Sequence, residues 1–84
     1  MMSFELTQHA RDALVKRGIS MEWLERVLKF PELTEPDATD AMLEHWLAVI
    51  PEHGDRVLRV IINPHTTPIR VVTLYFDRKR KGRL

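Results

Sequence analysis

The sequence contains no cysteine, and its 84 residues include only three glycines. The absence of cysteine excludes disulfides and thiol chemistry. The glycines are dispersed, so the chain lacks the glycine-rich loops that hold phosphates in dinucleotide-binding and P-loop proteins. Ser3 lies near the start and Ser20 at an expected helix cap, and neither forms a nucleophile elbow. These absences exclude ordinary nucleotide-binding and acyl-transfer enzymes.

Signals for a membrane, a secretory route or a metal are also missing. No apolar run approaches the roughly 20 residues that cross a bilayer, and the start MMSFELTQHA lacks a cationic segment followed by an apolar core. We therefore expect no membrane association, no secretory signal and a cytoplasmic location. We also expect no metal and no cofactor, because no i, i+4 pair or zinc-motif spacing occurs among the histidines. These are His9, His45, His53 and His65.

The net charge of +1 hides an uneven distribution of charge along the chain. Residues 1–52 carry five basic and ten acidic side chains, whereas residues 53–84 carry eight basic and two acidic ones. The basic half favours an anionic partner, and the opposed charges of the two halves also permit head-to-tail association into a homodimer.

The first part of the chain predicts two short helices. Thr7 is typical of a helix cap, and Gly18 after two basic residues is typical of a helix end, so a helix is expected over 8–17. Ser20 caps a second helix that the following proline ends. Together these signals predict a helical hairpin over 7–30.

Residues 31–40 are acidic, contain two prolines and lack periodicity, which predicts a surface connection. The next three segments are rich in Val, Ile, Leu and aromatic residues and are separated by turns, as in an antiparallel meander. We therefore expect one α+β domain over 1–84, with the helices on one face of a sheet of three, or four, antiparallel strands. The meander covers 41–77, with strands at 42–50, 56–63 and 69–77, and a basic tail follows at 78–84.

Alternation along the strands divides the predicted sheet into two faces. One set of alternate positions is largely apolar and predicts the face that packs on the helices. The other set mixes apolar residues with His45, Arg59, Asn63, Thr73 and Tyr75. This mixed face suits either a functional site or a half-exposed surface with ordinary polar residues. The predicted core face comprises Met42, Glu44, Trp46, Ala48, Ile50, Leu58, Val60, Ile62, Val72, Leu74 and Phe76.

His9 lies two residues after the Thr7 cap, in the first turn of the first predicted helix. Free backbone N–H groups at the positive end of a helix favour anions. A neutral imidazole beside them suits a phosphate site, and it equally suits a histidine packed partly on the sheet. We expect His9 to face the edge of the sheet near Tyr75.

Histidine, tyrosine and arginine side chains are sufficient for one metal-independent reaction, the cleavage of RNA by its own 2′-hydroxyl. The reaction needs a base for the hydroxyl proton, an acid for the leaving oxygen and cations around the phosphorane. The residues of this chain permit this chemistry without demanding it.

Two stretches of the chain resemble a known family. They are the start with Thr7, His9, Ala10, Arg17, Gly18, Ile19 and Ser20, and the ending RVVTLYFDRKRKGRL. With them the chain resembles the prokaryotic domain of unknown function 4258, which is grouped with RelE-like and BrnT-like toxins in the barnase, EndoU, colicin and RelE nuclease superfold. The resemblance implies a RelE-like fold, a metal-independent ribonuclease and, as is normal for toxins, a cognate antitoxin protein.

The resemblance also implies roles for single residues. It implies catalytic roles for His9, Thr73 and Tyr75, which match the family's first-helix histidine and its last-strand Thr-x-Tyr. The arginine expected four residues after the histidine is Ala13 here, a departure that bears on activity. The competing interpretation is a non-enzymatic interaction module or a dimer without nuclease activity. Candidate RNA and phosphate contacts are Arg17, which matches the family's arginine before the glycine, and Arg59, Arg78 and Arg80 of the basic half.

Overall fold

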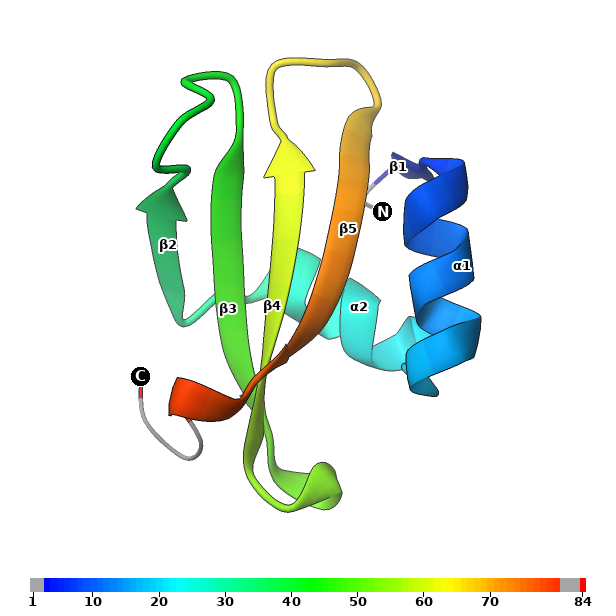
Figure 1. Cartoon of the computed structure of the whole chain (residues 1–84), viewed down its shortest axis with the longest axis vertical. Helices are drawn as coiled ribbons and strands as arrows, with labels where there is room; N and C mark the ends of the chain where they lie inside the picture. The colour runs from blue at the N-terminus through cyan, green and yellow to red at the C-terminus, as the bar shows by residue number, and fades with distance from the viewer. Residues whose placement is uncertain (1–2, 81–83) are drawn as a thin grey trace.

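Two helices and a five-stranded sheet, in the order β1-β5-β4-β3-β2, make up the fold (Figure 1). The structure is a computed structural model that describes residues 3–80 and 84. The elements in chain order are β1 (Phe4–Leu6), α1 (Gln8–Arg17), α2 (Met21–Lys29), β2 (Leu33–Pro36), β3 (Glu44–Ile50), the 3₁₀ turn η1 (Pro51–His53), β4 (Arg56–Asn63), β5 (Ile69–Asp77) and the 3₁₀ turn η2 (Arg78–Arg80).

Both helices form at the positions that their capping residues predict. The Thr7 hydroxyl accepts a hydrogen bond from the Ala10 amide at the start of α1, and the Ser20 hydroxyl accepts one from the Glu22 amide at the start of α2. Helix α1 ends at Gly18, whose φ of 63° lies in the left-handed region that glycine adopts readily. The α+β class and the helix pair are confirmed.

The sheet differs from the expected one in strand number and direction. β1 pairs in parallel with β5, and β2 pairs antiparallel with β3, so the sheet has five strands and is mixed. The prediction of three or four antiparallel strands is therefore wrong. Strands of three and four residues are too short for alternation to be recognised. β2 lies within the expected connection 31–40 and tolerates Pro36 because it is an edge strand.

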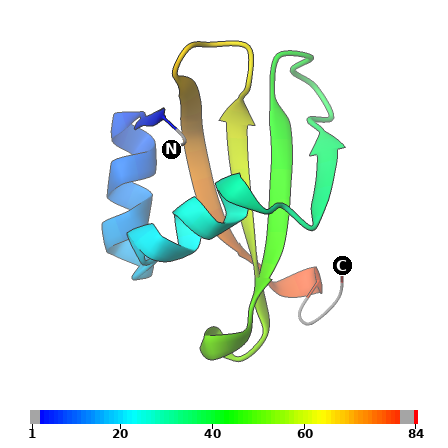
Figure 2. The same cartoon turned by 180° about the vertical axis from the view of Figure 1, so that it is seen from behind.

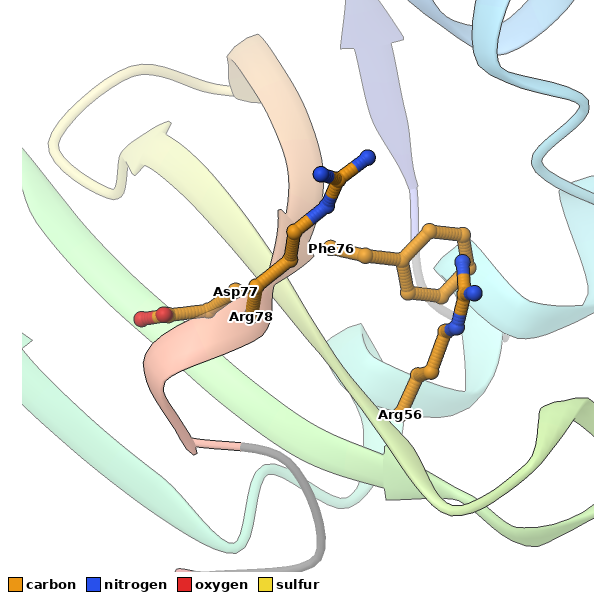
Figure 3. Close-up of a pocket in the computed structure, with 4 residues that line it drawn as sticks. All are labelled: Arg56, Phe76, Asp77 and Arg78. Carbon is orange, nitrogen blue, oxygen red and sulfur yellow. The ribbon is translucent and has the colours of Figure 1, made fainter.

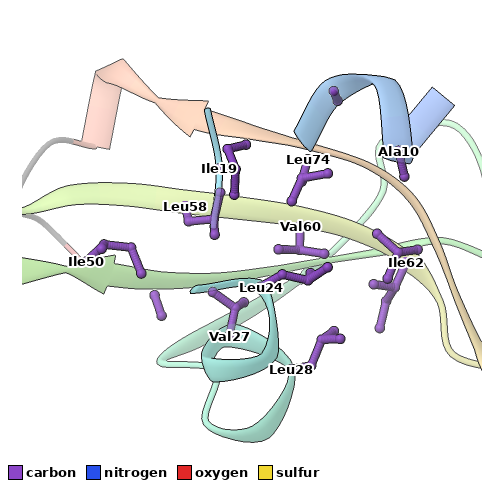
Figure 4. Close-up of a cluster of buried hydrophobic side chains, with 13 residues drawn as sticks. Ala10, Ile19, Leu24, Val27, Leu28, Ile50, Leu58, Val60, Ile62 and Leu74 are labelled. Atoms are coloured by element: carbon purple, nitrogen blue, oxygen red, sulfur yellow. The ribbon is translucent and has the colours of Figure 1, made fainter. Parts of the chain in front are cut away.

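The hydrophobic core lies between the helices and one face of the sheet. Figure 2 shows α2 crossing this face, where it contacts β3 and β4, and α1 lies against β5. Apolar side chains from the helices and strands meet in this layer (Figure 4). Each large aliphatic side chain buried here contributes roughly 1.5–3 kcal/mol. The largest are Leu24, Val27, Leu28, Ile50, Leu58, Val60, Ile62, Val71 and Leu74.

The predicted core face is confirmed along β4 and needs correction at two places. Met42 is 50% exposed, because β3 begins two residues later than expected. Val71 rather than Val72 is buried in the core, because the pairing of β4 with β5 shifts register between Ile61 and Ile62. The extra residue in β5 reverses which side chains face the core between the start of β5 and Val71. Leu14, Trp23, Trp46 and Phe76 are partly buried against the core.

The second face of the sheet is partly covered by the chain end. In Figure 1, η2 crosses in front of the sheet on the side opposite α2, and it packs against β4. Arg59 and Tyr75 pair across β4 and β5 on this face. Leu47 and Val57 alternate onto the same face and are fully buried. The polar residues of this face therefore lie in a partly enclosed setting.

Candidate functional site

Three adjoining hollows at the end of β5 share Phe76 and Arg78 in their walls. Their volumes are about 400, 410 and 360 Å³. Figure 3 shows Arg56 extending from β4 toward the Phe76 ring, with Arg78 on the neighbouring strand end. We call the combined surface the arginine hollow. Its walls comprise Arg17, Arg56, Arg59, Tyr75, Phe76, Asp77, Arg78 and Lys79.

The cations of the arginine hollow come from separate parts of the chain. Arg17 lies in the last turn of α1, where the helix dipole favours a positive side chain. Arg56 opens β4 just after the left-handed turn that contains Gly54, and Arg78 directly follows β5. All three residues are exposed. Within residues 3–80 and 84, no carboxylate forms an ion pair with any of them, so their guanidinium groups face solvent.

Tyr75 and Phe76 supply aromatic walls to the arginine hollow. Consecutive strand residues point to opposite faces, so Tyr75 lies on the face that η2 crosses and Phe76 on the helix side. Both residues reach the hollow because β1 pairs only with Ile69–Val71, which leaves β5 as the edge of the sheet at this end. The Phe76 ring centroid lies 4.7 Å from that of His53 and 6.0 Å from that of Trp23. These contacts hold the Phe76 ring in place while one side of it remains in the hollow.

Arg59 differs from the other cations because its guanidinium is already engaged. Its Nε and Nη2 donate to Asp77 Oδ2 at 3.1 and 2.7 Å, and its Nη1 donates to Glu35 Oε1 at 3.3 Å. The side chains of Arg59 and Asp77 are only 13% and 12% exposed, so solvent screens the pair weakly. We call the connected residues the Arg59 network, which comprises Glu35, Asp37, His45, Arg59, Asp77 and Arg80.

His45 links Arg59 to the turn after β2. Arg59 Nη1 donates to His45 Nδ1 at 2.7 Å, and because a guanidinium has no acceptor, Nδ1 is the unprotonated nitrogen. Nε2 therefore carries the hydrogen and donates to Asp37 Oδ1 at 2.7 Å. This hydrogen bond, with those from the amides of Asp40 and Thr39, holds the pKa of Asp37 well below its ordinary value.

The Arg59 network also ties η2 to the sheet. Asp77 Oδ1 accepts a hydrogen bond from the Lys79 amide at 3.0 Å, and Arg80 Nη2 donates to Glu35 Oε2 at 2.9 Å. Burial by itself raises the pKa of Asp77, but hydrogen bonds from Arg59 and from the Lys79 amide outweigh burial and lower that pKa. Asp77 is therefore a carboxylate paired with Arg59, although it lines the hollow.

The structure brings some of the predicted site residues together and separates others. Arg17, Arg78 and Tyr75 line the arginine hollow, and Arg59 lines one part of it. His9 is exposed in the first turn of α1, about 12 Å along the helix from Arg17 at roughly 1.5 Å per residue. His9 therefore lies at the opposite end of α1 from the hollow that contains Tyr75.

Thr73, Arg80 and Ala13 do not line the arginine hollow either. Thr73 is half-buried in β5, and Arg80 is engaged in the Arg59 network. Ala13 stands where the family has an arginine according to the resemblance. It is 4% exposed and packs in the core, so this position faces the sheet. Lys81 and Arg83 of the basic tail lie outside the described residues.

Sequence reasoning missed Arg56 and the Arg59 network. Arg56 carries a recognisable signal, since it is a cation at the first position of a strand after a Gly-Asp turn. The network carries none, because Glu35 is 24 residues from Arg59 and 45 residues from Arg80. Only the order of the strands brings these side chains together.

The described part of the chain holds no cluster of three or more histidine, aspartate or glutamate side chains that could bind a metal ion. Neither of the helices in that part is long and apolar enough to cross a membrane.

The two histidines near the site lie in separate settings, with His45 in the Arg59 network and His53 against Phe76.

A family model matches residues 6–76, from the end of β1 almost to the end of β5. The chain belongs to the family described as Domain of unknown function (DUF4258). The expected family is thus confirmed. The DUF4258 match contains Arg17, Arg56, Tyr75 and Phe76 of the arginine hollow, whereas Arg78 lies just beyond it. No curated protein and no solved structure matches the chain.

Proposed function

We propose that this DUF4258 protein binds single-stranded RNA through its backbone phosphates in the arginine hollow. One observation carries the proposal. Arg17, Arg56 and Arg78 come from three elements, line adjoining hollows and have no carboxylate partner among the described residues. A guanidinium suits a phosphate because its planar fork can donate two parallel hydrogen bonds.

The aromatic walls favour a single strand over a duplex. Bases of a single strand stack on aromatic side chains, with a contribution of about 1–3 kcal/mol per base, whereas a duplex keeps its bases stacked on each other. Tyr75 and Phe76 lie beside Arg17, Arg56 and Arg78 in the walls of the hollow. The resemblance to RelE-like and BrnT-like toxins favours RNA as the nucleic acid.

Binding is the activity that the geometry supports best, and cleavage is the further possibility that the family resemblance adds. Cleavage by the 2′-hydroxyl needs a base and an acid at one phosphate. Tyr75 lines the hollow, while His9 and Thr73 lie outside it. Incubation of labelled RNA with the purified protein, with and without a chelator, tests cleavage directly.

Fluorescence anisotropy with a labelled single-stranded RNA tests the binding site. Arg17→Gln, Arg56→Gln and Arg78→Gln should each weaken binding about tenfold, because a hydrogen bond to a charged group contributes roughly 1.5 kcal/mol. Arg11→Gln removes the same charge from an exposed position of α1 outside the hollow, and it should change the affinity about twofold or less.

The salt dependence of binding gives a second measurement. The logarithm of the binding constant should fall with the logarithm of salt concentration by about 0.7 for each phosphate contacted, and each hollow variant should reduce this slope. Equal weakening by Arg11→Gln and by the hollow variants would show that the site is wrong. Absence of binding at low salt would contradict the function and favour an interaction module.

A further inference from the structure

We infer that Arg59, acting with Glu35 and Asp77, is a positioning residue that holds η2 across the sheet so that Arg78 faces the arginine hollow. The inference rests on the proposed function and adds to it. Arg59 itself is paired with two carboxylates and offers few free donors to a phosphate. Its contribution to binding is therefore to set the place of another arginine.

The junction between β5 and η2 sets the direction in which Arg78 leaves the sheet. Asp77 is the last residue of β5 and Arg78 is the next residue, so the direction of the chain at Asp77 decides where Arg78 goes. Asp77 Oδ2 accepts hydrogen bonds from two N–H groups of Arg59, and Asp77 Oδ1 accepts one from the Lys79 amide. This side-chain turn bends the backbone around Arg78. Figure 3 shows the side chains of Asp77 and Arg78 leaving the chain in different directions.

The other end of η2 is anchored through Arg80. Arg80 Nη2 donates to Glu35 Oε2, while Glu35 Oε1 accepts from Arg59 Nη1. One guanidinium therefore connects the anchors on both sides of Arg78. The turn has only three residues, so with both anchors in place its middle has little freedom to turn away from the hollow.

Arg59 is itself held in place by His45 and, through it, by Asp37. His45 accepts from Arg59 Nη1 and donates to Asp37, whose carboxylate is also held by backbone amides of the following turn. The side chains of Arg59, His45 and Asp37 are 13%, 15% and 19% exposed. Largely buried, mutually hydrogen-bonded groups of this kind have a defined geometry, and Arg59 is fixed from the side opposite Asp77.

A purely electrostatic interpretation of the same carboxylates predicts the opposite result. If Glu35 and Asp77 acted only through their negative charge near a basic hollow, their removal would strengthen binding to a phosphate backbone. If they position η2, their removal frees Arg78 and weakens binding, although the protein becomes more positive. The sign of the change therefore separates the two interpretations.

The experiment measures binding of a labelled single-stranded RNA by anisotropy for Glu35→Gln and Asp77→Asn. Positioning predicts about three- to tenfold weaker binding for each, as the ordered guanidinium contact at Arg78 is lost. Asp55→Asn is the matched control, because it removes an exposed carboxylate next to Arg56 without touching the network. Asparagine also tolerates the left-handed backbone at this position, where φ is 56°. This control should bind as tightly as the wild type or more tightly.

A double-mutant cycle connects the effect to Arg78. In an Arg78→Gln background, Glu35→Gln should change the affinity by less than about twofold, because the residue that it positions is gone. Tighter binding by Glu35→Gln and Asp77→Asn, as for Asp55→Asn, would overturn the inference. So would a Glu35→Gln effect of the same size with and without Arg78.

A measurement without RNA keeps the inference testable if the proposed function fails. Backbone ¹⁵N order parameters at residues 78–80 should fall in Glu35→Gln, while those in β4 stay at wild-type values. Glu35 is 34% exposed, so this variant disturbs the fold less than a substitution of the more buried Arg59 or Asp77 would. Wild-type order at 78–80 would refute positioning of η2. If the network variants weaken RNA binding while Arg17→Gln and Arg56→Gln have no effect, the arginine hollow is not the RNA-binding site.

Discussion

Replacement of Arg59 by methionine should lower the free energy of unfolding by about 3 kcal/mol. The substitution keeps an unbranched side chain but removes the four hydrogen bonds that the guanidinium makes with Asp77, Glu35 and His45. The Asp77 carboxylate, in a side chain that is 12% exposed, would lose its cation. Breaking a buried pair costs about 3–5 kcal/mol, and the lower end applies because Glu35 is 34% exposed and can be hydrated.

Urea unfolding followed by tryptophan fluorescence and circular dichroism measures this loss. A domain of 84 residues has a total stability of about 4–13 kcal/mol, so the variant loses roughly a quarter to three quarters of it. At about 4–8 °C per kcal/mol, the midpoint of thermal unfolding should fall by about 12–24 °C. Arg70→Met is the control, because its pair with Glu5 is half-exposed and contributes about 1 kcal/mol or less.

The pH dependence of stability gives an independent check on the same pair. The pKa of Asp77 is lowered in the folded protein, so its ionised form stabilises the fold at pH values above the unfolded pKa of about 3.9. This contribution is lost as the pH falls through the lower, folded pKa. Arg59→Met should therefore flatten the acid side of the stability profile. Wild-type stability together with an unchanged acid profile would refute the reasoning about the network.

Four further substitutions test the packing, the C-cap of α1 and the register. Leu24→Ala should lower the free energy of unfolding in urea by about 2–5 kcal/mol, because Leu24 is fully buried, and a loss below about 1 kcal/mol would contradict the assigned core. Gly18→Ala should lower thermal stability by about 1 kcal/mol through its φ of 63° alone, since no atom lies within 4 Å of an added Cβ; an unchanged melting temperature would speak against the left-handed cap. Val71→Asp should abolish the folded circular dichroism spectrum, while Val72→Asp should be milder, and equal effects would contradict the register shift in β5.

The elements set by local chemistry were the best predicted ones. Thr7 and Ser20 begin their helices through hydrogen bonds that span two or three residues, and these signals are visible in the sequence. β4 and β5 have the predicted bounds, because long apolar strands between turn sequences are distinctive. The two missed strands are short edge strands whose pairing partners, rather than their composition, make them strands.

The candidate site was predictable only in part. Arg17, Tyr75 and Arg78 were all proposed, yet nothing in their spacing shows that they share one hollow. His9 was proposed because it lies in the first turn of a helix, and the structure has it there. The way α1 packs against β5, however, brings the last turn of α1 to the arginine hollow and leaves His9 at the far end of the helix. The partners of Arg59 were not predictable, because they lie on strands and turns that are remote in sequence.

The sequence by itself determined the helix caps, the alternation of the long strands, the uneven charge and the membership of the DUF4258 family. The tertiary structure alone decided the parallel pairing of β1, the register shift that buries Val71, and the network that engages Arg59. It also decided that Arg17 and Arg56 have no carboxylate partner among the described residues. The physical reason is the separation along the sequence of the residues that interact. Caps and alternation depend on neighbours along the chain, whereas strand order depends on burying a whole apolar face of the sheet. Side-chain pairs between residues up to 45 positions apart form only once the strands have this order.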